Sequence, residues 1–558
     1  MKRTNTIILW ITLIAALLLG IFTMTSPTPK DKEDWFSAKR AFTHLEVIAK
    51  HQHSVFDLNE IEEVRNYLEE TLNTFDHVNW TRVRHSPIEV NNRKTRTRES
   101  INIDNIYAEI PGTSGMYMLI VAHFDSSPYK EKYGVGTEGS YGAADDGYGI
   151  ATMLEIMKLL NDFAEKNTLV NGIKFAFTDA EEVALGGAKA LVTEYAHWLK
   201  DVNIVLNLEA RGNKGPLYMF QTNNNNSKLI DFYSHARLPF SFSIAADVYK
   251  HLPNDTDFTP FLKAGYTGLN FATLKSLKYY HTPLDNLGNA DMATLQFYGE
   301  QIYPLVIEYI SKEKYSTKES FISNKNAVFF TLFPGFMVYY SQTVSWVLTI
   351  LAFLFIVTLA FYTIRKKALS WKKALLTFTI WIGFILFSTI VGLLLTKFIG
   401  LLTGNPFSFT YMPHVPFDFW LMIIFAMLVL VLGVFVAKLC HRLKYGVNDM
   451  LGGAVLLLLL LNTAFAFLLH GGTFLFIWPA LFMLTILALN LFWPSGKRWW
   501  KHILPTLAVL VTSTMYIMLI YSLFLALTFG ALAVILLFTG ILGCVLVQFK
   551  NCFTFASD

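Results

Sequence analysis

Two stretches of the sequence decide the fold: MYMLIVAHFD at residues 116–125 and IKFAFTDAEE at residues 173–182. Each is an apolar run of strand length that is followed directly by acidic or histidine side chains. A helical pattern covers residues 149–163 between them, and a second one covers residues 187–199. Strands that alternate with helices predict an α/β fold, with a mostly parallel sheet and helices on both faces.

Further apolar runs at residues 202–208 and 267–273 extend the predicted sheet. In an open sheet of this kind, ligands bind beyond the carboxyl ends of the strands. Acidic or histidine residues follow each run, and more of them open the helix after the first run. In chain order they are His123, Asp125, Asp145, Asp146, Asp179, Glu181, Glu182, Glu209 and His281. We expect these side chains to meet at one edge of the sheet.

Each of these groups has an ordinary structural explanation when it is taken alone. A His-x-Asp pair is common on surfaces, a Glu-Glu pair suits a helix start, and the turn at residues 142–147 could be a helix cap. Their shared position after strands or at a helix start favours a functional site instead. Because residues 25–340 contain no cysteine, a metal held there must use His, Asp and Glu ligands.

The order of these motifs resembles the M28 family of zinc peptidases, an aminopeptidase family, across roughly residues 40–310. The resemblance is carried by His123-x-Asp125, Gly142-Ala-x-Asp145, Glu181-Glu182 with Gly186-Gly187, Leu208-Glu209-Ala210 and Tyr280-His281-Thr282. NLEARG at residues 207–212 and PNDTDF at 253–258 resemble the membrane-embedded branch, which includes endoplasmic-reticulum and vacuolar-membrane proteases and bacterial relatives. Tyr148 and Ala188 depart from the family's usual Ser, and we expect them to affect packing or pocket shape.

The resemblance implies two Zn²⁺ ions bridged by Asp145. One ion would be completed by His123 and Glu209, and the other by Glu182 and His281. Imidazole and carboxylate groups are suitable zinc ligands, and a shared carboxylate can hold two ions about 3.5–4 Å apart.

The resemblance also implies catalytic and supporting roles for neighbouring residues. Glu181 would be the general base that takes a proton from water and returns it to the leaving amine. Asp125 would orient the imidazole of the first metal-binding histidine, and Asp285 would act similarly or be an exposed acid at a helix start. Tyr280 would donate a hydrogen bond to the oxyanion, or would only pack beside the second histidine.

Arg211 has several candidate roles. It could bind a substrate carboxylate, stabilise the negative charge of the site, or pair with Asp255 or Asp257. We favour a structural or supporting role. The two aspartates lie in a loop that could approach the substrate or could stabilise a turn.

The composition divides the chain into apolar and soluble regions. Hydrophobic residues make up 53% and charged residues 16%, against about 25% charged residues in soluble domains. The run Thr6–Met24 is long enough to span a bilayer, and no small-residue cleavage pattern follows it, so a retained anchor is favoured over a signal peptide. Further predicted spans are 345–364, 374–401, 418–439, 450–470, 473–493, 503–526 and 529–548.

The loops between these spans predict their orientation, because cytoplasmic loops are rich in Lys and Arg. Basic residues occupy alternate loops, at Arg365, Lys366, Lys367, Lys372, Lys373, Arg442, Lys444, Lys497, Arg498 and Lys501. We therefore expect a transmembrane anchor at residues 1–27, an extracytoplasmic peptidase domain at 28–340, and a membrane domain of about seven helices at 341–558 with a cytoplasmic C-terminus. The cysteine-free soluble segment and its compact size favour a bacterial cell membrane.

The leading functional hypothesis is a membrane-anchored zinc exopeptidase, most simply an aminopeptidase, that acts on peptides. Alternatives are a carboxypeptidase, another hydrolase or cyclase of the same family, a non-catalytic peptide-binding protein, and a transporter with an accessory domain. The transporter is disfavoured because the apolar runs are nearly free of acids. Nucleic acid is an unlikely partner at a net charge of +4 with no basic groove, whereas the lipid bilayer is an expected one.

Overall fold

The computed structural model describes residues 2–92, 95–129, 138–252, 254–366, 369–405, 412, 415–492 and 500–555. Pro253 of the PNDTDF motif and the loop residues Lys367, Lys497 and Arg498 lie outside these described residues. The chain divides into two compact units. One is an α/β unit of residues 25–330 and 335–339, and the other is a helical unit of residues 1–24, 331–334 and 340–558.

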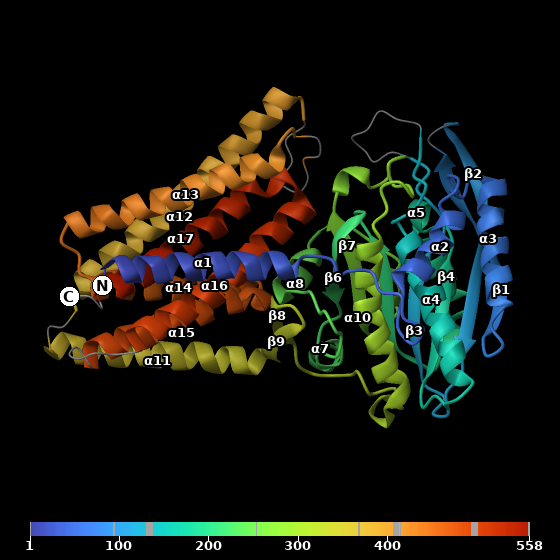
Figure 1. Ribbon diagram of the computed structural model, residues 1–558, viewed down its shortest axis with the longest axis horizontal. Helices are drawn as coiled ribbons and strands as arrows, with labels where there is room; N and C mark the ends of the chain where they lie inside the picture. Colours follow the sequence, from blue (N-terminus) through green and yellow to red (C-terminus); the bar gives the residue numbers. More distant parts are fainter. Residues whose placement is uncertain are drawn as a thin grey trace. The chain divides into compact units, whose positions relative to one another are not determined.

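The α/β unit is built on a mixed sheet with the strand order β1-β2-β4-β3-β5-β7-β6 (Figure 1). Strands β4, β3, β5 and β7 run parallel in its centre, and β1, β2 and β6 pair antiparallel at its edges. The strands are β1 (Asn79–Asn92), β2 (Thr97–Ile110), β3 (Tyr117–His123), β4 (Gly172–Thr178), β5 (Val202–Ala210), β6 (Lys214–Thr222) and β7 (Gly268–Lys275). The expected α/β class is confirmed, with a parallel centre and antiparallel edges that the sequence analysis did not include.

Helices cover both faces of this sheet, as expected. They are α2 (Ala38–Ile48), α3 (Leu58–Leu72), α4 (Gly147–Ala164), α5 (Glu181–Ala184), α6 (Gly186–Thr193), α7 (Ser227–Tyr233), α8 (Ser243–Tyr249), α9 (Phe258–Lys263) and α10 (Met292–Ser311). The predicted helix at 187–199 is divided into α6 and a short 3₁₀ turn, Ala196–Leu199.

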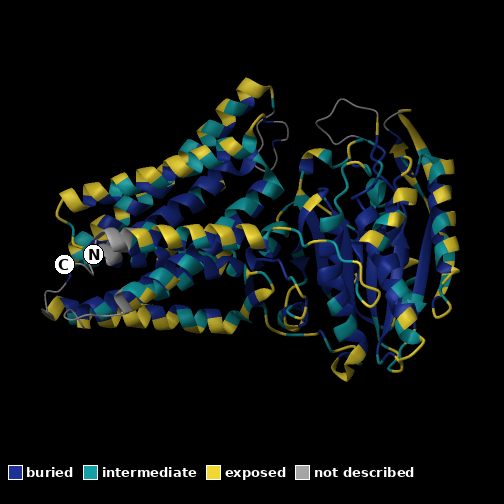
Figure 2. Ribbon diagram, in the orientation of Figure 1, coloured by how far each residue is buried: buried dark blue, intermediate teal, exposed yellow. Residues whose placement is uncertain are grey.

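Alternation along β3 explains why both faces need a cover. Met118 and Ile120 join a core with α2, α4 and α10, whereas Leu119 and Val121 join a second core with α6 and α9. Successive side chains of a strand point to opposite faces, so a strand that is apolar at every position must be buried on both sides. Figure 2 shows these central strands as buried, between helices whose outer faces are exposed.

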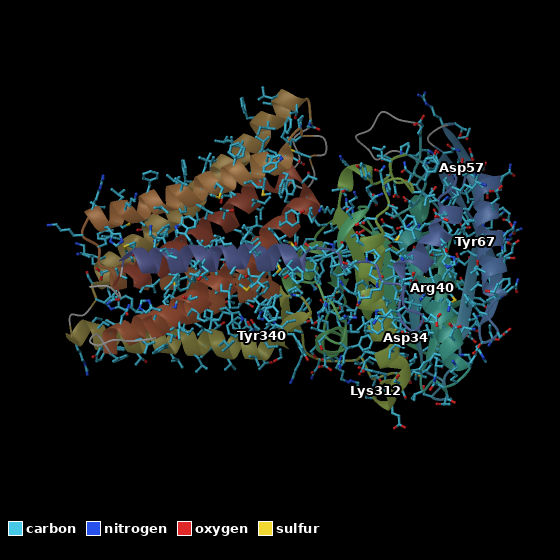
Figure 3. The ribbon with its side chains drawn as sticks, viewed as in Figure 1. Asp34, Arg40, Asp57, Tyr67, Lys312 and Tyr340 are labelled. Atoms are coloured by element: carbon cyan, nitrogen blue, oxygen red, sulfur yellow. The ribbon has the colours of Figure 1, made fainter. Side chains whose placement is uncertain are left out.

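Polar contacts fix α2 and α3 to the rest of the unit. Arg40 on α2 donates to Glu155 of α4, with a shortest N–O distance of 2.6 Å, and Tyr67 on α3 shares a 2.7 Å hydrogen bond with His44; Arg40 and Tyr67 are labelled in Figure 3. Arg65, also on α3, donates to the buried carboxylate of Asp179 at 2.6 Å. This contact holds the end of β4 just before the Glu-Glu pair.

The helical unit contains the predicted membrane spans. Among the described residues, seven helices are long and apolar enough to cross a membrane. These helices are α11 (Gln342–Lys366), α12 (Trp371–Thr403), α13 (Asp418–Arg442), α14 (Val447–Leu468), α15 (Phe474–Phe492), α16 (Trp500–Leu527) and α17 (Leu532–Phe555). Their agreement with the predicted apolar runs confirms the helical block.

Helix α1 (Lys2–Thr23) belongs to the same unit and packs along α16. Its apolar part, Ile7–Thr23, is shorter than the seven spans. Ala16 is fully buried, and the Cβ position of Gly20 lies only 3.3 Å from Ile517. Small residues four positions apart therefore allow the two helices to approach closely, as is common between helices in membranes.

We expect Arg65→Met to destabilise the α/β unit by about 3–5 kcal/mol, because it leaves the carboxylate of Asp179 buried without its cation. Thermal unfolding of the full chain in detergent, followed by near-ultraviolet circular dichroism, measures this change. Lys39→Met is the matched control, since the Lys39–Asp31 pair is exposed on both sides and such pairs contribute about 0–1 kcal/mol. Equal unfolding midpoints for the two variants would contradict the expectation.

Candidate active site

The carboxyl edge of the central strands gathers the acidic and histidine residues singled out in the sequence. His123 ends β3, Glu209 lies at the end of β5, and Glu182 follows β4 in the first turn of α5. Asp145 lies in the turn before α4, and His281 lies in the loop after β7. Parallel strands bring their carboxyl ends to one edge, so residues distant in the chain become neighbours.

Within the described ranges, these residues form overlapping groups whose nitrogen and oxygen atoms lie within 4.8 Å of one another. One group contains His123, Asp145 and Glu209, and another contains Asp145, Glu182 and His281. His123 Nε2 lies 3.6 Å from Asp145 Oδ1 and 3.8 Å from Glu209 Oε2. His281 Nε2 lies 3.3 Å from Asp145 Oδ2 and 3.0 Å from Glu182 Oε2. Asp145 thus presents a different oxygen to each histidine.

The donor atoms of these groups fit a divalent metal better than they fit one another. Among the buried atoms without a hydrogen-bond partner are His123 Nε2, Asp145 Oδ2, Glu182 Oε1 and His281 Nε2. Zinc binds such atoms tetrahedrally at about 2.0–2.2 Å, which places neighbouring ligand atoms roughly 3.3 Å apart. The observed separations of 3.0–3.8 Å bracket that value. Each group could therefore hold one cation.

Asp125 contacts both His123 and the Glu-Glu pair. His123 Nδ1 lies 2.9 Å from the backbone carbonyl of Asp125, and 3.5 Å from its carboxylate. The carboxylate accepts hydrogen bonds from the backbone amides of Glu181 and Glu182, at 3.0 and 3.2 Å. The carbonyl thus orients the imidazole so that Nε2 faces the site, while the carboxylate positions the Glu-Glu pair.

The backbone around this pair is unusual. Helix α5 is a single turn bounded by two non-glycine residues in the left-handed region, Ala180 at φ 56° and Leu185 at φ 53°. Such residues cost about 1–3 kcal/mol each and cluster at functional sites. The one-turn helix presents Glu181 and Glu182 as adjacent carboxylates, and an oxygen of each lies within 4.8 Å of a His123 ring nitrogen.

Asp285 is a buried part of the site and not an exposed acid at a helix start. Its carboxylate accepts hydrogen bonds from Ser140 Oγ, the backbone amides of Ala144 and Asp145, and Asn213 Nδ2, at 2.9–3.2 Å. Burial, and then repulsion from Asp145, raise the pKa of Asp285 to about 7. The loop that carries His281 is therefore tied to the turn that carries Asp145.

Tyr280 and Arg211 lie beside the second group. The Tyr280 ring stacks on the His281 ring with centroids 3.7 Å apart, and the Arg211 guanidinium lies 5.3 Å from the Tyr280 ring centroid. The pairing of Arg211 with Asp255 or Asp257, which was one of its candidate roles, is not found among the described residues. Asp257 instead accepts a hydrogen bond from Thr178 and is buried, while Asp255 is exposed.

Electrostatics indicate that this edge needs additional positive charge. Burial raises the pKa of Glu182 to about 7 and that of Glu209 to about 8, and repulsion from Asp145 adds to both shifts. Burial alone would lower the pKa of His281, but Glu182 and Asp145 raise it to about 10. Without a metal, the site thus retains protons that a divalent ion would replace.

Some supporting residues were not found by the sequence analysis. Asn207 Nδ2 donates to Glu209 Oε1 at 3.0 Å, and the Tyr298 hydroxyl donates to the Glu209 carbonyl at 2.5 Å. Alternation along a strand could have indicated Asn207, which lies two residues before Glu209 and so on the same face. No sequence signal connects Tyr298 on α10 to β5. Tyr148, where a Ser is usual, is fully buried, and its hydroxyl donates to the Asn213 carbonyl at 2.9 Å.

An α/β sheet that presents histidine and carboxylate groups at its strand ends is the framework of a metal-dependent hydrolase. Comparison with known proteins supports this class. Residues 105–306 match peptidase family M28, so the chain carries a peptidase family M28 domain. Peptidases of this family depend on zinc, which agrees with the donor set at the sheet edge.

The relatives include an endoplasmic reticulum metallopeptidase and a vacuolar membrane protease. The chain is 30% identical over 264 residues to the putative endoplasmic reticulum metallopeptidase 1-A of Caenorhabditis elegans, a match that covers 46% of this chain and 28% of that protein. It is 25% identical over 424 residues to a vacuolar membrane protease of Candida dubliniensis, with coverage of 73% and 42%. The expected membrane-embedded branch of the family is thereby confirmed. The chain spans less than half the length of these relatives.

A solved structure also matches the α/β part. The glutaminyl cyclase of Porphyromonas gingivalis shares 20% identity at a TM-score of 0.39, over 49% of this chain and 98% of that one.

We expect the zinc affinity of the metal-free protein to rise between pH 6 and pH 9. A zinc ion that binds these groups would displace protons from Glu182, Glu209 and His281, whose pKa values are about 7, 8 and 10, so acid favours the protonated, metal-free site. Calorimetric titration in buffers of different ionisation enthalpy measures both the affinity and the protons released. An affinity that is flat across this range, with no proton release, would contradict this account of the site.

Proposed function

We propose that the protein is a membrane-anchored di-zinc exopeptidase, most simply an aminopeptidase, that hydrolyses peptides on the extracytoplasmic side of a membrane. The single observation that carries this proposal is the position of Asp145. Its two carboxylate oxygens face two histidines, at 3.6 and 3.3 Å, and each histidine also faces a glutamate. A bridging carboxylate between two metal ions has this arrangement of neighbours.

The proposed ligand sets follow from the two groups. His123 and Glu209 would complete one zinc site, and Glu182 and His281 the other, with Asp145 common to both. When bound, zinc acts as a Lewis acid that polarises the peptide carbonyl and acidifies water in the site.

Glu181 would act as the general base. Its backbone amide is held by Asp125 at 3.0 Å, and its side chain lies within the group that also contains His123 and Glu182. Burial raises the pKa of Glu181 well above its ordinary value, and repulsion from Glu209 and Glu182 adds to this shift. A carboxylate with a raised pKa can take a proton from the attacking water, hold it, and deliver it to the leaving amine.

The Tyr280 hydroxyl would donate a hydrogen bond to the negatively charged oxygen of the tetrahedral species. The stacked His281 ring limits the rotation of the Tyr280 ring, and the adjacent guanidinium of Arg211 favours negative charge nearby. These contacts support a role in stabilising the oxyanion.

Asp257, a buried carboxylate near Glu181 and Glu209 that is not a proposed zinc ligand, supports aminopeptidase action, because it would attract the free ammonium group of a peptide. Carboxypeptidase action, a cyclase-type reaction and peptide binding without catalysis are the alternatives. Products released from a tripeptide distinguish them: an aminopeptidase frees the first residue, a carboxypeptidase frees the last, and a binding protein frees neither.

The orientation in the membrane is proposed from the alternate basic loops. Arg442, Lys444 and Lys372 lie at the ends of described spans, and would face the cytoplasm together with the C-terminus. The α/β unit would then lie outside. Its lack of cysteine fits a bacterial cell membrane.

We expect Glu181→Gln to lower peptide hydrolysis by about 10²- to 10⁴-fold while zinc content stays near that of the wild type, because the change removes the base and retains the metal ligands. Full-length protein in detergent is assayed with aminoacyl nitroanilides and tripeptides, and zinc is measured by atomic absorption. Glu165→Gln, at the C-terminal end of α4, is the control. Full activity of the Glu181 variant would remove it from the base role.

The proposed orientation predicts which side of the membrane is labelled by an impermeant maleimide. In a background whose cysteines are replaced by serine, Asn224→Cys in the exposed turn before α7 should react in intact cells. Lys372→Cys at the start of α12 should react only after the cells are permeabilised. If only the Lys372→Cys variant were labelled in intact cells, the result would contradict the proposed orientation and support the opposite one.

A further inference from the structure

Strand β5 carries the proposed zinc ligand Glu209 near its end, and Arg211 follows one residue after the strand. Asn207 and Glu209 are two residues apart on β5, so they point to the same face of the strand, whereas Arg211 lies in the bend just beyond it. Asn207 is fully buried, Glu209 is 6% exposed and Arg211 is half-buried. Arg211 is thus the most exposed of the three residues and lies just beyond the strand that carries a proposed zinc ligand.

The backbone that carries Arg211 is rigidly held. Its amide donates to the Thr273 carbonyl at 2.9 Å, which continues the β5–β7 ladder. The next residue must be glycine, because a Cβ on Gly212 would lie 2.2 Å from the Lys275 carbonyl oxygen. Thr273 Oγ1 donates to the Gly212 carbonyl, and the Tyr148 hydroxyl donates to the Asn213 carbonyl. The side chain thus starts from a fixed position.

The guanidinium itself has no carboxylate partner within ion-pair distance in the described chain, which leaves out residues 130–137 and 253. It lies instead over the Tyr280 ring, at 5.3 Å from the centroid. This is notable beside so many acids, since a guanidinium that served only to neutralise them would be expected to contact one. Contact with the ring orients the guanidinium and leaves its N–H donors available.

The site and the guanidinium are close enough to share one short peptide. The Arg211 guanidinium lies 5.3 Å from the Tyr280 ring centroid, which lies 3.7 Å from the His281 ring centroid. The guanidinium and the His281 ring are therefore within about 9 Å of each other. One residue of extended peptide spans about 3.3–3.6 Å. A carboxylate one or two residues from the scissile bond therefore reaches Arg211 while the bond lies at the zinc ligands.

We propose that Arg211 is a specificity-determining residue that binds a carboxylate of the substrate on the leaving side of the scissile bond. The planar fork of a guanidinium matches a carboxylate with two parallel hydrogen bonds. The preferred substrates are then short peptides, above all dipeptides, whose free C-terminus lies next to the cleaved bond. This inference rests on the proposed peptidase function. An acidic side chain on the leaving residue supplies the same chemistry.

The experiment compares matched substrates with the full-length, zinc-loaded protein in detergent. Dipeptides Xaa-Ala are assayed with a free and an amidated C-terminus, and Xaa-Glu-amide is assayed against Xaa-Gln-amide. A charge-assisted hydrogen-bond pair changes binding roughly 10- to 100-fold. We expect kcat/KM to favour the free carboxylate by this factor, mainly through KM, and we expect Arg211→Ala to abolish the preference, so that free and amidated substrates react at the same rate. A preference confined to Xaa-Glu-amide would assign the site to the acidic side chain.

Two control variants separate recognition from general electrostatics. Arg211→Lys keeps the charge but lacks the fork, and should recover only part of the preference. Lys158→Ala removes one exposed cation about three turns along α4 from the Asp145 turn, and should leave the preference intact. If Arg211→Ala slows the hydrolysis of free and amidated peptides equally, the guanidinium only balances the negative charge of the site. If it lowers the zinc content, the guanidinium is needed for the structure of the site. Either result overturns the inference.

Binding to the Glu181→Gln variant makes the test independent of turnover. Calorimetry should show tighter binding of the free dipeptide than of its amide, and this difference should vanish when Arg211→Ala is added. Hydrolysis of both substrates without discrimination would refute the role of Arg211 and leave the peptidase function intact. Discrimination in binding with no hydrolysis by the wild type would refute the peptidase function and keep the role of Arg211.

Discussion

The whole arrangement depends on the burial of several carboxylates beside two histidines whose facing atoms have no hydrogen-bond partners. A buried unpaired charge costs several kcal/mol, so this edge of the sheet is favourable only when cations or protons fill it. The raised pKa values of Glu182, about 7, and of Glu209, about 8, reflect the same lack of positive charge at this edge. The electrostatics of the M28 domain thus favour the binding of cations at this edge, because the surrounding hydrogen bonds hold the acids close together.

Much of the surrounding structure serves to hold these acids in place. Asp125 fixes the backbone of the Glu-Glu pair, and Asp285 fixes the turn that carries Asp145. Arg65 reaches from α3 to Asp179, just ahead of that pair. His281 itself has a left-handed backbone, at φ 52°. Strain and buried ion pairs at a site are tolerated where the surrounding packing determines them, and here two cores on the faces of the sheet supply that packing.

The sequence predicts some parts of this structure and not others, for physical reasons. Strands β3, β4, β5 and β7 were found because a strand covered on both faces must be apolar throughout. The long hairpin of β1 and β2 was missed because its exposed face is charged and polar, which leaves no continuous apolar run. The proposed metal-site residues were indicated by their position after strands, a local signal. The burial of Asp285, and the contact of Arg211 with a ring in place of an aspartate, depend on segments distant in the chain, which one sequence does not bring together.

The most direct measurement is the number and position of metal ions, located by anomalous diffraction from crystals of the protein loaded with zinc or with cobalt. The account predicts two metal ions per chain, about 3.5–4 Å apart, with Asp145 between them and one histidine on each. A single ion, or ions that contact neither His123 nor His281, would contradict it.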